Sequence, residues 1–166
     1  MLKQADNIKL FDKTVFYNDN DLKNDENFWS KHSSFISKNK RGYGYWLWKP
    51  YLIQKTMSLL NDGDILMYLD AGCEIDIRNK NEIEKYFEIV KKDYICGTLT
   101  SDHPERKWCK MDLLIKLDMV DNDEVLDSIQ RQAGAQLIYV CNKTRELINE
   151  WYTIVSNDYH MIDDTK

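Results

Sequence analysis

The chain has 166 residues, of which 43% are hydrophobic and 12% aromatic, and this composition excludes a disordered polypeptide. Its 23 basic and 28 acidic side chains give a formal charge of −5, which argues against nucleic acid as the main partner because phosphates bind to basic surfaces. The sequence has no apolar run long enough to span a membrane. Its four cysteines form no C-x-x-C pair and indicate free thiols, so we expect the protein in the cytoplasm. The length predicts one domain over residues 1–166.

The N-terminal part predicts short elements around a basic loop. A strand is expected over Thr14 to Tyr17, and a helix in pieces over Leu22 to Ile36. Lys38 to Gly44 reads as a basic, glycine-containing loop. Pro50 then stands where prolines start helices, and apolar residues follow it at helical spacing.

The next segment, Ile65 to Leu69, is a continuous apolar run that follows the turn Asn61 to Asp64. Such a run is typical of a strand that is buried on both faces of a parallel sheet. Asp70 comes directly after it, so we expect this carboxylate at the carboxyl end of a buried strand.

The C-terminal half continues the alternation of helices and strands. The sequence predicts a helix around Ile83 to Val90, a short strand over Tyr94 to Cys96, a helix over Trp108 to Leu117, a strand over Ala135 to Val140 and an amphipathic helix over Thr144 to Val155. This alternation indicates an α/β domain with a mostly parallel sheet flanked by helices.

Asp70 is the first candidate for a functional residue. Ligands of open α/β sheets bind beyond the carboxyl ends of strands, and one or two carboxylates can hold a divalent cation when phosphates and waters complete its shell. Gly72 would allow a ligand to approach the backbone closely. The alternative is that Asp70 only caps a turn, and the pattern favours neither interpretation.

The segment from Arg41 to Pro50 places four aromatic residues between two cations, just before a helix. Aromatic faces suit the stacking of bases and sugar rings, and cations suit phosphates. The alternative is that the aromatic side chains fill the core. We expect some of both, with Trp46 and Trp48 in the core and with Arg41 and Lys49 at a ligand or the surface.

Two further segments carry weaker signals. His103 to Asp112 has cations near a helix start, a place suited to anions, although a solvated charged face explains them better. Gln130 to Ala135 is a polar turn that either lines a sugar pocket or simply connects two elements. Neither a phosphate-binding loop nor a cysteine–histidine pair with a recognisable motif is present in the sequence.

Two blocks of sequence, R-G-Y-G-Y-W-L-W-K-P-Y-L-I (Arg41 to Ile53) and D-G-D-I-L-M-Y-L-D-A-G-C-E-I (Asp62 to Ile75), resemble a family of glycosyltransferases with the GT-A fold. Members occur in bacterial surface-polysaccharide loci and in large viruses. The similarity continues through Glu105 to Leu114, Gln130 to Ile138 and Glu150 to Tyr152. The resemblance implies a Rossmann-like, mostly parallel sheet and the transfer of a sugar from a nucleotide-sugar donor to a glycan or other acceptor, usually with Mn²⁺ or Mg²⁺.

The resemblance also implies roles for individual residues. Asp70 matches the first Asp of the D-x-D signature that holds the metal, whereas Gly72 stands at the second Asp. An inverting enzyme would need a carboxylate base, for which Asp102 and Asp112 are the candidates. The residues expected near the donor are Arg41, Tyr43, Lys49, Asp70, Ala71 and Gly72, and those expected near the acceptor are Gln132, Ala133 and Gly134.

The family pattern extends beyond this chain in both directions, so we expect a domain shortened at both ends. Family members begin with a strand that would precede Met1, and they carry a late metal ligand that would follow Lys166, with His160 as a weak substitute. Two alternatives therefore remain. One is a degenerate module that binds a nucleotide or glycan without turnover. The other is a haloacid-dehalogenase-like phosphohydrolase, which requires a second Asp where Gly72 stands.

Overall fold

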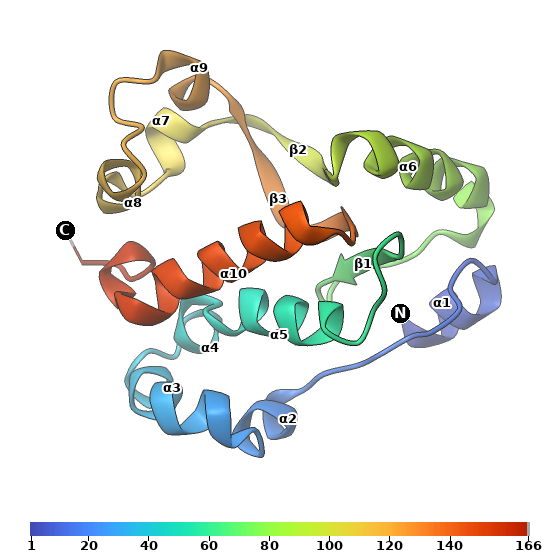
Figure 1. Ribbon diagram of the computed structural model, residues 1–166, viewed down its shortest axis with the longest axis horizontal. Helices are drawn as coiled ribbons and strands as arrows, with labels where there is room; N and C mark the ends of the chain where they lie inside the picture. The colour runs from blue at the N-terminus through green and yellow to red at the C-terminus, as the bar shows by residue number, and fades with distance from the viewer. Residues whose placement is uncertain (166) are drawn as a thin grey trace.

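The computed structural model describes residues 1–165, without the side chain of Ser101. Helices surround a small central sheet (Figure 1). The strands are β1 (Ile65–Leu69), β2 (Ile95–Pro104) and β3 (Ile129–Tyr139). The α-helices are α1 (Leu2–Ile8), α2 (Asp19–Lys23), α3 (Glu26–Lys38), α4 (Gly42–Tyr45), α5 (Trp48–Met57), α6 (Lys80–Asp93), α7 (Glu105–Trp108), α8 (Met111–Lys116), α9 (Asp123–Leu126) and α10 (Asn142–Asn157). Two 3₁₀ turns are η1 (Ile77–Asn79) and η2 (Tyr159–Met161).

The sheet is antiparallel, with the order β1-β3-β2, so the expectation of a mostly parallel, Rossmann-like GT-A sheet is wrong. The central strand β3 pairs with β1 from Ile65↔Tyr139 to Leu69↔Ala135, and with β2 on its other side. The expectation failed because a continuous apolar run predicts a strand but not the direction of its partner. The five residues of β1 are half-buried, as an edge strand allows.

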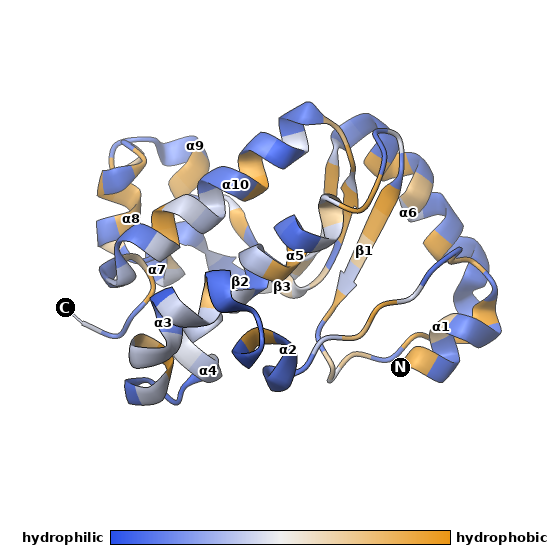
Figure 2. Ribbon diagram, turned by 60° about the horizontal axis from the view of Figure 1, so that its bottom comes forward, coloured by the Kyte–Doolittle hydropathy of each residue, from blue (hydrophilic) through white to orange (hydrophobic). Residues whose placement is uncertain are grey.

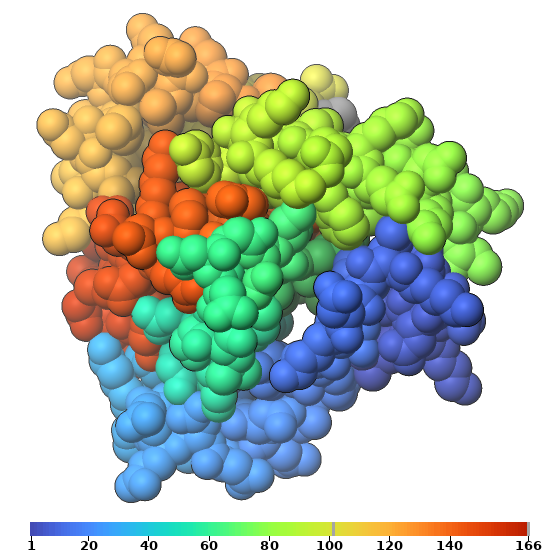
Figure 3. Space-filling view, turned by 45° about the vertical axis from the view of Figure 1, so that its right-hand side comes forward, coloured from blue at the N-terminus to red at the C-terminus, as the bar shows by residue number. Residues whose placement is uncertain are grey.

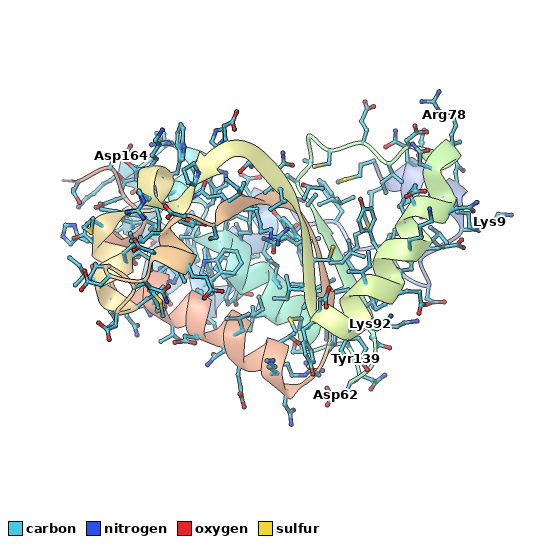
Figure 4. The ribbon with its side chains drawn as sticks, turned by 90° about the horizontal axis from the view of Figure 1, so that it is seen from above. Lys9, Asp62, Arg78, Lys92, Tyr139 and Asp164 are labelled. Carbon is cyan, nitrogen blue, oxygen red and sulfur yellow. The ribbon has the colours of Figure 1, made fainter. Side chains whose placement is uncertain are left out.

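The antiparallel register sets the two ends of β1 apart. Asp62, in the turn before β1, lies with Tyr139 at one end of the sheet (Figure 4). Asp70 follows the opposite end, where the register places Leu69 beside Ala135. The candidate carboxylate therefore faces the middle of β3, and the segment 130–135, which the sequence predicted as a turn, is part of that strand.

Helices α5 and α10 lie side by side against the sheet (Figures 1 and 2). Their apolar faces meet β3 in a buried cluster made of Ile53, Met57, Ile138, Val140 and Ile148. The apolar spacing of α10 was predicted from the sequence, and the helix begins with a capping box in which the Thr144 hydroxyl accepts the Cys141 N–H at 3.1 Å. These two helices hold one end of the candidate site in place.

The N-terminal region follows a different course from the one predicted. Residues 14–17 form no strand and run as an extended connection between α1 and α2, in which Val15 and Phe16 are exposed. Among the helices of residues 1–165, none combines the length and the apolar character that a membrane crossing requires. The four cysteines are free thiols, as the sequence indicates.

Candidate functional site

Asp70 is the centre of the candidate site, at the end of β1. Its backbone N–H donates to the Gly134 carbonyl at 2.8 Å, and its own carbonyl accepts the Cys73 N–H at 2.9 Å. Asp70 therefore closes a turn, as expected from the alternative interpretation that it caps one. Its side chain is nevertheless 37% exposed and lines a cavity, so the turn leaves the carboxylate accessible to a ligand.

Lys49 is the direct partner of Asp70. Its Nζ lies 3.0 Å from Oδ1 and 3.1 Å from Oδ2 of Asp70, and it also donates to the Ala133 carbonyl at 3.0 Å. The side chain is only 4% exposed and lines the cavity, so of the two expected positions, at a ligand or at the surface, the surface is excluded. A buried ammonium needs polar partners, and the carboxylate and the carbonyl supply them.

Tyr68 holds the carboxylate from a third direction. Side chains two residues apart in a strand point to the same face, and the Tyr68 hydroxyl donates to Oδ1 of Asp70 at 2.5 Å. Burial raises the pKa of Tyr68, and the hydrogen bond to Asp70 raises it further, so the phenol keeps its proton. The Lys49 ammonium also lies 5.2 Å from the centroid of the Tyr68 ring, within the range of a cation–π contact.

Gly134 lies directly against Asp70. A Cβ atom at this position would lie 2.9 Å from Oδ2 of Asp70, closer than van der Waals contact allows. The absence of a side chain on β3 is therefore what admits the carboxylate. The resemblance placed Ala133 and Gly134 on the acceptor side, and the structure brings both to Asp70.

A cavity of about 400 Å³ opens beside these residues. Its aromatic walls come from three side chains that the fold brings together: Tyr45, Trp46 and Trp151. The remaining lining residues are Leu47, Lys49, Pro50, Asp70, Ala133, Gly134, Val155 and Ile162. The site thus combines an apolar wall with a few convergent polar groups, which is typical of small-molecule sites.

Trp46 belongs to the cavity and not to the core, so the expectation that it is a core residue is wrong. It is 43% exposed. The backbone explains this position, because Trp46 ends the α4 turn with a left-handed φ of 59°, and its ring lies over Gly42. Trp48, by contrast, packs against a core cluster as expected, and its indole N–H donates to the Gly42 carbonyl at 3.0 Å.

A second cavity, of about 300 Å³, lies on the far side of Asp70. It is lined mainly by apolar residues of α1, the extended connection, α5 and β1, together with Asp70 and Ala71. Figure 3 shows the opening between the N-terminal segment and the surface of α5 and β1. Ala71, expected near the donor, therefore lines this second cavity.

Arg41 and Tyr43, both expected near the donor, take different positions. Arg41 is exposed and forms an ion pair with Asp164, and its guanidinium lies 5.8 Å from the Trp46 ring, at the rim of the first cavity. Tyr43 packs against the core with its hydroxyl buried, and within residues 1–165 that hydroxyl has no hydrogen-bond partner. Neither side chain lines the cavity.

The remaining predicted site residues also lie outside the first cavity. The Gln132 side chain accepts the Thr98 hydroxyl at 3.1 Å, and Gly72 is exposed with open space around it. The candidate bases Asp102 and Asp112 are exposed and are not brought to Asp70, and Asp112 lies 3.6 Å from Lys110. His160 contacts Thr165 at 2.9 Å.

The cations of the segment His103 to Asp112 are largely paired within the protein. Arg106 binds Asp123 and Asp127, and Lys110 donates to Asp163 at 2.8 Å. These contacts favour the interpretation of a charged surface over that of an anion site.

Sequence reasoning missed seven of the residues that line the cavity: Tyr45, Trp46, Leu47, Pro50, Trp151, Val155 and Ile162. Tyr45 stands in the aromatic segment singled out above. Trp151 was assigned to the apolar stripe of α10, and its spacing alone does not distinguish a cavity wall from core packing.

The donor atoms around Asp70 do not fit the divalent cation that the resemblance implies. Both carboxylate oxygens of Asp70 already face the Lys49 ammonium, and no other residue known to line the cavity carries a carboxylate. Within residues 1–165, no group of three His, Cys, Asp or Glu side chains is placed to hold a metal ion. An ammonium that lies on both oxygens competes with a metal ion for the same carboxylate, and the two positive charges would repel each other.

No protein family, curated protein or solved structure matches the chain.

Proposed function

We propose that this chain is a glycosyltransferase-type domain that transfers a sugar from a nucleotide-sugar donor to a hydroxyl of a glycan or other acceptor, and that the cavity at Asp70 holds the donor. One observation carries the proposal. Lys49, Asp70 and the backbone of Ala133 and Gly134, which come from three separate segments, meet at a single cavity. All three segments belong to the blocks that carry the sequence resemblance.

The shape and chemistry of the cavity support a sugar-containing ligand. Its volume of about 400 Å³ lies within the range of small-molecule sites. Trp46 and Trp151 line the cavity, and aromatic rings are suited to contacts with a sugar ring or a base. The Asp70 carboxylate accepts hydrogen bonds from hydroxyl groups, and sugars offer several of them.

The reaction places defined demands on such a site. The acceptor oxygen forms a bond to the anomeric carbon while the bond from that carbon to the diphosphate oxygen breaks. The acceptor proton must leave, and the departing nucleoside diphosphate develops negative charge that cations stabilise. Two cations lie close to the cavity: Lys49 lines it, and Arg41 lies over the rings of Tyr45 and Trp46, which also line it.

A specific observation favours a second candidate function, a module that binds its ligand without turnover. Asp70 is the only carboxylate among the residues known to line the cavity, and it already accepts hydrogen bonds from Lys49 and Tyr68. A separate carboxylate that could take the acceptor proton is not found there. The same observation argues against a phosphohydrolase, which would use a second Asp close to the first.

The first test is a calorimetric titration with UDP and with GDP. We expect one of the two nucleotides to bind the wild-type chain, and Asp70→Asn to weaken its binding by about tenfold or more, because a charge-assisted hydrogen bond contributes roughly 1.5–3 kcal/mol. The matched control is Asp121→Asn, which makes the same change at an exposed turn and should bind as the wild type does. Equal affinity in Asp70→Asn and the wild type would refute the proposed site.

Asp70→Asn should also lower the free energy of unfolding, by about 1–3 kcal/mol, because the Lys49 ammonium would remain buried without its anionic partner. Chemical denaturation measures this cost and shows whether the variant is folded at the temperature of the titration. A transfer assay with sugar nucleotides then separates the two candidate functions. Product formation supports the enzyme, and binding without product supports the module.

A further inference from the structure

The polar centre of the cavity contains an ion pair where a metal-dependent site would have free carboxylate oxygens. We infer that Asp70 is committed to the Lys49 ammonium and that the cavity binds its ligand without a divalent cation, because this ammonium already occupies both carboxylate oxygens. The nucleotide identity of the ligand rests on the proposed function. The exclusion of the cation rests on the geometry of Lys49 and Asp70 alone.

The ammonium sits symmetrically on the carboxylate. Nζ lies 3.0 Å from one oxygen and 3.1 Å from the other, and the Tyr68 hydroxyl occupies a further position on Oδ1. A metal ligated by Asp70 would lie about 2.0–2.6 Å from an oxygen and hence at most about 5.7 Å from the ammonium. Two like charges at that distance repel each other strongly in a partly buried site.

Lys49 cannot move aside at low cost. Its side chain is 4% exposed, at the start of α5, and its ammonium also donates to the Ala133 carbonyl. The rings of Tyr68 and Trp48 lie 5.2 Å and 5.9 Å from Nζ. Withdrawal of the ammonium would leave the Ala133 carbonyl without this donor and would move a buried charge through an apolar surrounding.

The ion pair also determines which part of a ligand suits this position. Lys49 and Asp70 together carry no net charge, so the exposed part of the carboxylate is suited to hydroxyl groups and not to a metal–diphosphate complex. Ala133 and Gly134 bring their backbone to the same place, and Gly134 leaves room for Asp70 itself. The inferred ligand group at Asp70 is therefore a polyhydroxylated ring, that is, the sugar or the ribose of the donor.

Two titrations test the inference. In the first, Mn²⁺ alone is added to the wild type and to Asp70→Asn, and the free ion is measured by electron paramagnetic resonance. We expect the two proteins to take up Mn²⁺ equally weakly. Wild-type binding that is about tenfold or more tighter than that of Asp70→Asn would overturn the inference. The first titration needs no nucleotide, so it tests whether Asp70 binds a divalent cation even if the proposed function fails.

In the second titration, UDP and GDP are added to the wild type in EDTA and, separately, in Mn²⁺. We expect the dissociation constant of the nucleotide that binds to be the same in both buffers within about threefold, whereas a loss of about tenfold or more in EDTA would overturn the inference. Absence of nucleotide binding in both buffers would refute the proposed function, and the Mn²⁺ titration would still decide whether Lys49 excludes the metal.

Discussion

At the scale of single residues, the site depends on one missing side chain. Gly134 allows Asp70 to lie against β3, since a Cβ at position 134 would lie 2.9 Å from Oδ2. Its backbone is not in the left-handed region, so only the lack of space forbids a side chain there. The position of the carboxylate is thus set by a neighbour on another strand.

Gly134→Ala should therefore displace the Asp70 carboxylate and disturb its contacts with Lys49 and Tyr68. We expect nucleotide affinity to fall by about tenfold or more and the free energy of unfolding to fall by about 1–3 kcal/mol, the cost typical of an overpacked site. Calorimetry and chemical denaturation measure the two effects. Gly72→Ala is the matched control, because its new Cβ would meet open space. Equal nucleotide affinity in the two variants would contradict the role given to Gly134.

Trp46→Ala tests the aromatic wall. Because Trp46 is 43% exposed, its removal should lower the free energy of unfolding by only about 1 kcal/mol, below the roughly 3–5 kcal/mol of a core tryptophan. Loss of a stacking surface should weaken nucleotide binding by about tenfold. The control is Trp108→Ala, which removes an exposed tryptophan that does not line the cavity. A stability loss of core size would place Trp46 back in the core.

The sequence did not predict the burial of Lys49. A cation next to aromatic residues was expected at a ligand or the surface, because lysine is rarely buried. The partners that stabilise it, Asp70 and the Ala133 carbonyl, stand 21 and 84 residues away along the chain. Contacts of this kind depend on strand pairing and cannot be read from local spacing.

At the scale of secondary structure, α3 is joined to the C-terminal helix through a buried histidine. His32 is fully buried, and its two ring nitrogens lie 2.9 Å from the Tyr159 hydroxyl and 3.0 Å from the Tyr152 hydroxyl. Burial lowers the pKa of His32 to about 4, and the charge of Lys31 contributes to the shift. The folded chain therefore holds this imidazole neutral.

This shift makes the stability dependent on pH with a defined sign. The folded pKa of His32 is below the unfolded value of 6.5, so the unfolded chain binds the proton first as the pH falls. The stabilisation is complete above pH about 6.5 and is lost progressively as the pH falls to about 4, by roughly 3 kcal/mol in total.

His32→Gln should remove most of this dependence. The test is chemical denaturation at pH 7 and at pH 4.5 for the wild type, for His32→Gln and for the control His160→Gln, in which an exposed histidine is changed. We expect the control to keep the wild-type difference between the two pH values and His32→Gln to reduce it by about 2–3 kcal/mol. The same difference in all three proteins would show that His32 does not titrate as inferred.

The elements themselves were predicted unevenly. Ile65–Leu69 was predicted with its observed bounds, and α10 without its first two and last two residues, because a strong apolar pattern specifies both. The predicted parallel arrangement of the strands was wrong, and residues 130–135 were assigned to a turn although they belong to β3. Polar and glycine residues in that strand resemble a loop, and only pairing with β1 and β2 reveals their conformation.

At the scale of the whole molecule, the cavity is built from segments that lie far apart in the sequence. They are the α4–α5 region, the end of β1, the middle of β3, α10 and Ile162 near the end of the described chain. The C-terminal segment is held by ion pairs from Asp164 to Arg41 and from Asp163 to Lys110. Figure 4 shows Asp164 on the opposite side of the molecule from Lys9 and Arg78.

The segments that the resemblance singled out contribute to the cavity, but its fold expectation is wrong, and of the nine donor-side and acceptor-side residues that it implied only Lys49, Asp70, Ala133 and Gly134 line the cavity. The aromatic segment and the Asp70 turn are local in sequence, so their residues could be singled out as candidates. Their meeting with Trp151 and Gly134 depends on the antiparallel pairing of β1 with β3 and on the packing of α10. Those contacts are properties of the folded chain as a whole.

The central claim is that the cavity at Asp70 binds the sugar-containing part of a nucleotide-sugar donor beside the Lys49–Asp70 ion pair. The most direct measurement is a crystal structure of the chain grown with UDP-sugar or GDP-sugar in the presence of EDTA. We expect a ring hydroxyl within hydrogen-bond distance of Asp70, with Lys49 still on the carboxylate. A donor bound elsewhere, or a Lys49 side chain displaced from Asp70 by the ligand, would contradict the central claim.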